Sequence, residues 1–237
     1  MDRYSRTARL YPMIIFYLPL IVVGALVTFW DLDKNIHFTV PFGAMGVLAY
    51  FAAQIGRDGG KRKEKKLWED WGGAPTTQLF RWSDGHFDRH TKGRNHQKMH
   101  SLCPVGHLTD EPYERSNTIL VDEAYRAWTS HIISNARGTK KYPRIFRVKM
   151  AYGFRRNLWG LKPVSIILIG ILALATYGFL GFKAGVWTVE TYPQVFFISE
   201  GFLLLCLVCW LFIIRKNWIK IPAFAYAERL HEAIGQL

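Results

Sequence analysis

A histidine-rich stretch, residues 85–107, holds the residue types in this 237-residue chain that could bind a metal. It reads GHFDRHTKGRNHQKMHSLCPVGH, and its candidate ligands are His86, His90, His96, His100, Cys103 and His107. Two pairs of these histidines are four residues apart, a spacing that on a helix puts both rings on one face, as a zinc site requires. No HExxH or paired CxxC motif accompanies them, so a solvated basic loop is the favoured interpretation and a membrane-anchored metalloenzyme is the alternative.

Other catalytic signatures are missing from the sequence, which contains no Walker P-loop, no GxSxG and no kinase motif set. We therefore expect no catalytic residues, no bound metal and no cofactor.

Basic residues are concentrated between residues 57 and 162, where 22 of the 31 Lys and Arg residues are found beside 11 acidic ones, a net charge of +11. One group, Lys61–Lys66, directly follows an apolar segment. Attraction to anionic lipid head groups is sufficient to explain a basic run in that place.

A second basic group is far in sequence from any apolar segment and is the candidate ligand site. Its members are Arg89, Lys92, Arg94, His96, Lys98, Lys140, Lys141, Arg144 and Arg147. Cations interleaved with aromatic rings suit a polyanion with stackable bases, that is, a nucleotide or a single-stranded oligonucleotide. A solvated positive face is the alternative. If the protein is a homo-oligomer, several copies of this charge lie near one another and need an anionic counterpart.

Four apolar segments of 18 to 21 residues must position these groups, and each is long enough to cross a hydrocarbon core of roughly 30 Å. They are Tyr11–Trp30, Phe38–Ile55, Val164–Phe182 and Gln194–Ile214. Lys and Arg are concentrated at the N-terminus, in 57–162 and after Ile214. By the positive-inside rule both termini and the insert are cytoplasmic.

The sequence thus predicts an all-α membrane protein, with four transmembrane helices in two hairpins and a small, mostly helical cytoplasmic domain between them. The expected parts are an N-terminal arm (1–10), hairpin 1 (11–56), the basic domain (57–162), hairpin 2 (163–214) and an amphipathic tail helix (215–237). Apolar spacing predicts helices over 117–137 and 145–158 within the domain, and an apolar stripe in the tail that must dock on something.

Two features point to communication between the domain and the membrane. Gly59 and Gly60 interrupt the helix that continues the second span, either as a hinge or as a plain helix break. The stretch AYGFRRNLWGLKP (151–163) is expected to be the joint to the third span, with Pro163 starting the membrane helix. Its coupling residues are Arg155, Arg156 and Trp159, and the arginines are expected to contact lipid phosphate or nearby acids.

Glu200 is the one ionisable residue well inside a predicted span. A carboxylate there is costly unless it faces water or a partner, so a water-filled path is the functional interpretation. Snorkelling to the outer head groups is the alternative.

The blocks RDGGKRKEKKLWEDWGGAPTT (57–77), RHTKGRNHQK (89–98) and YGFRRNLWGLKP (152–163) resemble a group of bacterial four-span membrane proteins with a basic cytoplasmic insert. The chain is also similar in plan to the membrane effectors of Hailong-type anti-phage defence systems. That resemblance implies a tetrameric ion channel in the bacterial inner membrane, held shut by short DNA oligomers that a nucleotidyltransferase partner makes. A membrane scaffold that recruits a cytosolic partner remains a further alternative.

Overall fold

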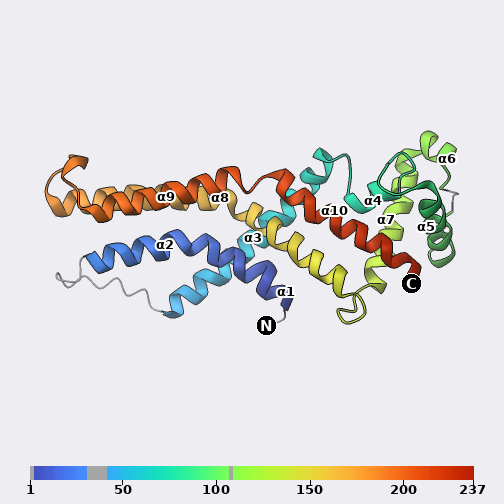
Figure 1. Cartoon of the computed structure of the whole chain (residues 1–237), viewed down its shortest axis with the longest axis horizontal. Helices are drawn as coiled ribbons and strands as arrows, with labels where there is room; N and C mark the ends of the chain where they lie inside the picture. The colour runs from blue at the N-terminus through green and yellow to red at the C-terminus, as the bar shows by residue number, and fades with distance from the viewer. Residues whose placement is uncertain (1–2, 31–41, 107–108) are drawn as a thin grey trace. The chain divides into compact units, whose positions relative to one another are not determined.

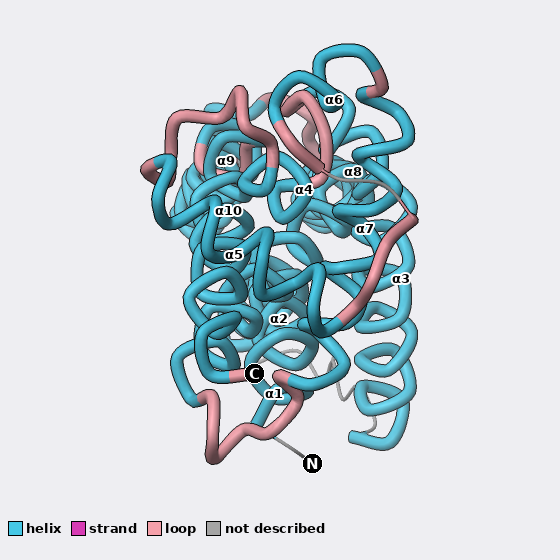
Figure 2. The backbone as a smooth tube through the Cα atoms, turned by 90° about the vertical axis from the view of Figure 1, so that its right-hand side faces the viewer, coloured by secondary structure: helices cyan, strands magenta, loops and turns pink. Residues whose placement is uncertain are grey.

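The computed structural model describes residues 3–30, 42–106 and 109–237, with the backbone alone for 42–49. All regular structure among these residues is helical, with no strand, which confirms the predicted fold class at the level of secondary structure (Figure 2). The longer helices are α2 (Tyr11–Trp30), α3 (Phe42–Asp70), α5 (Arg89–Leu102), α7 (Thr118–Asn135), α8 (Pro143–Ala184), α9 (Gln194–Phe212) and α10 (Lys216–Glu232) (Figure 1). The shorter ones are α1 (Arg3–Ser5), η1 (Arg6–Leu10), α4 (Pro75–Phe80), α6 (Glu111–Ser116), η3 (Val189–Thr191) and η4 (Ala233–Gln236).

The chain divides into two compact units, and each is made of two separate stretches of sequence. The first unit is Met1–Lys63 with Gly153–Trp218, and the second unit is Glu64–Tyr152 with Ile219–Leu237. The boundary differs from the predicted domain limits at 57 and 162, and the tail beyond Trp218 belongs to the second unit.

Three helices among the described residues are long and apolar enough to cross a membrane: Arg3–Trp30, Pro143–Ala184 and Gln194–Phe212. Four had been predicted from the sequence. The remaining segment, Phe38–Ile55, begins outside the described residues, and α3 is apolar only until Arg57 and Asp58. The described apolar part of α3 is therefore about 14 residues, or about 21 Å, which is shorter than a hydrocarbon core.

The core of the first unit is built from α2, α3, α8 and α9. Phe16 of α2, Leu161 of α8 and Leu203 of α9 are buried in one cluster, and Leu180 with Tyr192 belongs to a second cluster. Many other apolar side chains of α8 and α9 remain exposed, such as Leu174 and Leu204. Apolar faces turned outward along a helix are expected where the solvent is lipid.

Glycines bring α3 and α8 into close contact, and they correct the interpretation of Gly59 and Gly60 as an interruption. α3 runs without a break through both glycines. A Cβ atom on Gly59 would lie 3.1 Å from the carbonyl oxygen of Gly160, and one on Gly60 would lie 2.7 Å from that of Arg156. Both positions therefore serve the packing of the two backbones, as small residues do between membrane helices.

Pro163 also differs from its prediction, because it lies inside α8 rather than at the start of a helix. Proline has no N–H, so the carbonyl of Trp159, four residues earlier, loses its helical donor. The ammonium of Lys63 on α3 donates to this oxygen at 3.5 Å. A partner from the neighbouring helix thus compensates for the missing hydrogen bond.

The second unit has its own core, formed around α7. Tyr125 and Trp128 of α7 are fully buried against Phe80 of α4 and Met99 of α5. Gly72 and Gly73, with φ of 89° and 133°, form the left-handed turn that ends α3 before Pro75 starts α4.

The C-terminal tail docks on this same core. Leu230, Ala233 and Ile234 are buried in the cluster around α7, and Leu237 packs against it. The amphipathic stripe predicted for the tail is therefore satisfied within the second unit.

Candidate anion-binding site

Two of the nine predicted ligand residues lie in the core of the second unit rather than on a surface. Lys92 is 2% exposed, and its ammonium donates to the carbonyl oxygen of Arg81 at 2.7 Å and also contacts that of Asp84. Burial lowers the pKa of this lysine. Lys92 ties α5 to the loop after α4 and is not available to a ligand.

His96 has a similar structural role. Its Nε2 lies 2.8 Å from the carbonyl oxygen of Phe80, and its Nδ1 lies 3.1 Å from the carbonyl oxygen of Thr109 and 3.3 Å from the hydroxyl oxygen of the same residue. A neutral ring donates to only one of the two carbonyl oxygens: Nε2–H donates to that of Phe80, and Nδ1 then accepts from the Thr109 hydroxyl. Burial lowers the pKa of His96, which favours that neutral form.

The proposed metal cluster is dispersed. No group of three potential metal ligands comes together among the residues that the structure describes, and His107 lies outside them. His96 faces the core, while His86 places its Nε2 3.2 Å from a carboxylate oxygen of Glu228 on α10. The four-residue spacing of the histidines predicted pairs of rings on shared helix faces. One of these rings, that of His96, is instead buried in the core of the second unit.

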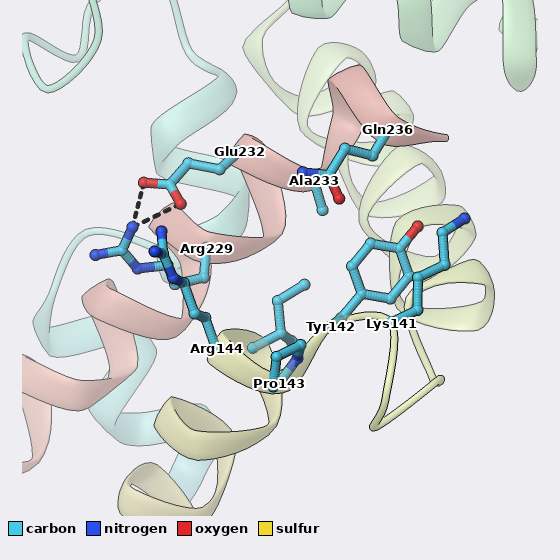
Figure 3. Close-up of a pocket in the computed structure, with 9 residues that line it drawn as sticks. Lys141, Tyr142, Pro143, Arg144, Arg229, Glu232, Ala233 and Gln236 are labelled. Carbon is cyan, nitrogen blue, oxygen red and sulfur yellow. Dashed lines mark hydrogen bonds and ion pairs between the residues drawn. The ribbon is translucent and has the colours of Figure 1, made fainter.

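Two other predicted residues, Lys141 and Arg144, line a cavity of about 240 Å³ between the start of α8 and the tail (Figure 3). Its polar lining is Lys141, Tyr142, Arg144, Arg229, Glu232 and Gln236. Arg229 donates from Nη1 to both carboxylate oxygens of Glu232 at 2.6 Å. In Figure 3 the side chains of Arg144 and Arg229 lie toward one end of the cavity and that of Lys141 toward the other.

One lining residue, Tyr142, has a buried and unsatisfied hydroxyl. Tyr142 is 5% exposed, and its hydroxyl has no hydrogen-bond partner among the described residues. The ammonium of Lys141 lies 5.1 Å from the centre of the same ring. Lys141 and Arg144, beside an Arg229 that is paired with Glu232, leave the lining with a net positive charge that suits a small anion such as a phosphate group.

Arg94 and Lys98 line a second cavity of about 440 Å³, between α5 and the tail. Its lining includes Phe87, Arg94, Asn95, Lys98, His231 and Glu232. Glu232 therefore lines both cavities. The two predicted groups of cations, about fifty residues apart in sequence, are brought to the same segment of the tail.

No protein-family model, curated protein or solved structure matches this chain. Its function is therefore inferred from its own residues.

The remaining predicted cations line neither cavity. Arg89 forms an exposed ion pair with Glu111 at 3.1 Å, and Lys140 and Arg147 are exposed. The sequence pattern predicts only an apolar docking stripe for the tail. It therefore misses three lining residues of the cavities: Arg229, His231 and Glu232. The spacing of Arg229 and Glu232, which are three residues apart on a helix beside that stripe, was the available signal.

One predicted coupling residue, Arg155, lies in the first unit and binds a backbone carbonyl, as does the neighbouring Lys162. Arg155 donates from Nη1 to the carbonyl oxygen of Trp218 at 2.7 Å, and its guanidinium lies 4.6 Å from the centre of that indole ring. Lys162 donates to the carbonyl oxygen of Ile214 at 2.9 Å. These cations therefore hold α8 to the junction of α9 and α10, where lipid phosphate or acidic side chains had been predicted as partners.

Glu200 has a partner inside the first unit. The hydroxyl of Thr176 on α8 contacts its carboxylate on α9, and Thr176 is buried. The carboxylate is half-buried. The contact joins two helices that are both candidate spans, which accounts for a polar residue at this depth without full exposure to lipid.

Proposed function

We propose that this chain is a membrane effector, an oligomeric ion channel that is gated by an anionic ligand, most simply a short single-stranded oligonucleotide. The observation that carries the proposal is the pair of cation-lined cavities on the tail of the second unit. Phosphate groups bind where several Lys and Arg side chains converge with few competing acids, and Glu232 is already paired with Arg229.

Gating requires a path from the ligand to the membrane, and α8 supplies a covalent one. This single helix contains Arg144 in its first turn and an apolar stretch long enough to cross a bilayer. Its 42 residues correspond to about 63 Å, about twice the thickness of a hydrocarbon core. A ligand that prefers one position of Arg144 therefore acts on the same element that crosses the membrane.

The proposed topology places both termini and the second unit in the cytoplasm of a bacterial inner membrane. The predicted segment Phe38–Ile55 is the fourth span of this proposed topology. Lys61–Lys66 then meets anionic lipid head groups. Resemblance alone supports the further expectations of a tetramer, a nucleotidyltransferase partner and a role in anti-phage defence.

The test is ion conductance of the purified protein in liposomes, measured with and without short single-stranded DNA. Because a ligand shifts an equilibrium only by its differential affinity for the two states, we expect the two currents to differ. Replacing Arg144 and Lys98 by Gln should remove the difference. Arg126→Gln, at an exposed arginine of α7 paired with Glu123, is the matched control.

Absence of current under both conditions would exclude a channel. Gating through these cavities would be excluded by a current that is the same with and without DNA. It would also be excluded if the Gln variant responds to DNA as the wild-type protein does.

A further inference from the structure

The larger of the two cavities has an aromatic wall. Phe87 lies in the loop before α5 and is half-buried, and its ring stacks on that of His231 from the tail, with centroids 5.5 Å apart and planes at 28°. Phe80 packs on the His231 ring as well, with ring centroids 4.0 Å apart. The wall is therefore buried at Phe80 and His231 and partly accessible at Phe87.

His231, the inner ring of the wall, is buried and neutral. The imidazole is 2% exposed and its Nε2–H donates to the carbonyl oxygen of Thr76 at 3.1 Å. Burial lowers the pKa of His231 to about 4, so the ring is neutral at pH 7 and its Nδ1 carries a lone pair. This nitrogen has no hydrogen-bond partner among the described residues.

Across from the rings, one face of α5 is polar and cationic. Thr91, Asn95 and Lys98 recur at three to four residues along it, and Arg94 reaches back to the hydroxyl of Thr91 at 3.3 Å. The exposed ends of Arg94 and Lys98 meet solvent at the edge of the cavity. Glu232 is the acid in the lining, and its charge is shared with Arg229.

We propose that this cavity is the base-binding subsite for a nucleotide unit. The flat heterocycle stacks on Phe87, while its phosphate lies at Arg94 and Lys98. The volume of about 440 Å³ falls within the range of small-ligand pockets, whereas the cavity of about 240 Å³ beside Arg144 is suited to a phosphate alone. The inference rests on the proposed function only in assuming that the ligand is phosphorylated.

The test is equilibrium binding to the purified full-length chain in detergent. The probes are the four deoxynucleoside 5′-monophosphates and 2-deoxyribose 5-phosphate, which has no base. Stacking on an aromatic side chain is expected to make at least one nucleotide bind about tenfold or more tightly than the baseless probe. Phe87→Leu should reduce that preference by about tenfold, while Lys98→Gln should weaken both probes equally.

Phe29→Leu, at an exposed phenylalanine of α2, is the matched control and should leave the preference unchanged. Equal binding of the nucleotides and the baseless probe by the wild-type chain would overturn the inference, even if Phe87→Leu fails to fold. An unchanged preference in a folded Phe87→Leu variant, checked by its helical circular dichroism, would also overturn it. Base-selective binding without any effect on conductance would contradict the proposed function alone.

Discussion

Gly160 is the position where a single methyl group tests the packing of α3 on α8. A Cβ atom there would fall on the backbone of Gly56 and Gly60, far inside van der Waals contact with the carbonyl oxygen of Gly56 and the nitrogen of Gly60. Backbone atoms cannot rotate away as a flexible side chain can. Gly160→Ala must therefore move one helix relative to the other within the first unit.

The expected magnitude follows from two opposing effects. Alanine in a helix interior is favoured over glycine by about 0.5–1 kcal/mol. Overpacking a close contact costs about 1–3 kcal/mol, and here the contact is to backbone on both sides. We expect a net loss of about 1–2 kcal/mol in the free energy of unfolding. Gly170, on the same helix, has nothing within 4 Å of the added atom, so Gly170→Ala should be neutral or stabilising.

The measurement is reversible unfolding in mixed detergent micelles, followed by circular dichroism, with both variants prepared in parallel. The two substitutions make the same chemical change in the same helix, so helix propensity cancels between them. If Gly160→Ala is as stable as Gly170→Ala, the described contact between α3 and α8 is not present in solution.

Three further predictions concern charge. His231 has a folded pKa of about 4 against about 6.5 when unfolded, so the unfolded chain binds the proton first and stability should fall by about 3 kcal/mol as pH drops from about 6.5 to about 4. Denaturant unfolding at stepped pH checks this, and a flat profile contradicts it. Lys92→Ala should lower the free energy of unfolding by about 2–3 kcal/mol, because buried carbonyls lose their donor, whereas Lys98→Ala should change it by less than about 0.5 kcal/mol. Arg155→Ala, together with Arg156→Ala, should leave ligand affinity intact and abolish the conductance response, and a parallel loss of both would refute a coupling role.

The helix content and the long apolar helices could be predicted from the sequence, because they depend on local composition and on the spacing of apolar residues. Residues 118–135 form a helix as the spacing of apolar residues predicted. Gly59, Gly60 and Pro163 were misinterpreted for one common reason. Glycine and proline weaken an isolated helix, but here a neighbouring helix uses the missing side chain or supplies the missing donor.

The candidate site was predicted only in part, since sequence shows which residues are cationic and not which are buried. Lys92 and Lys98 are indistinguishable by type and are six residues apart, yet one serves the core and the other lines a cavity. The contribution of the tail depended on its docking on α7, which no local pattern specifies. Burial and tertiary docking therefore decide which of the predicted cations remain available.

The contacts that hold α8 within the first unit are of a kind that a ligand could reorganise. Lys63, Arg155 and Lys162 each bind a carbonyl oxygen left free by a proline or by a helix end. Hydrogen bonds from charged donors contribute about 1.5–3 kcal/mol each, and water can replace a carbonyl partner at modest cost. Allosteric coupling energies are typically about 1–3 kcal/mol. Under the proposed function, exchange of one such contact has the magnitude that coupling between an anion at the start of α8 and the following span requires.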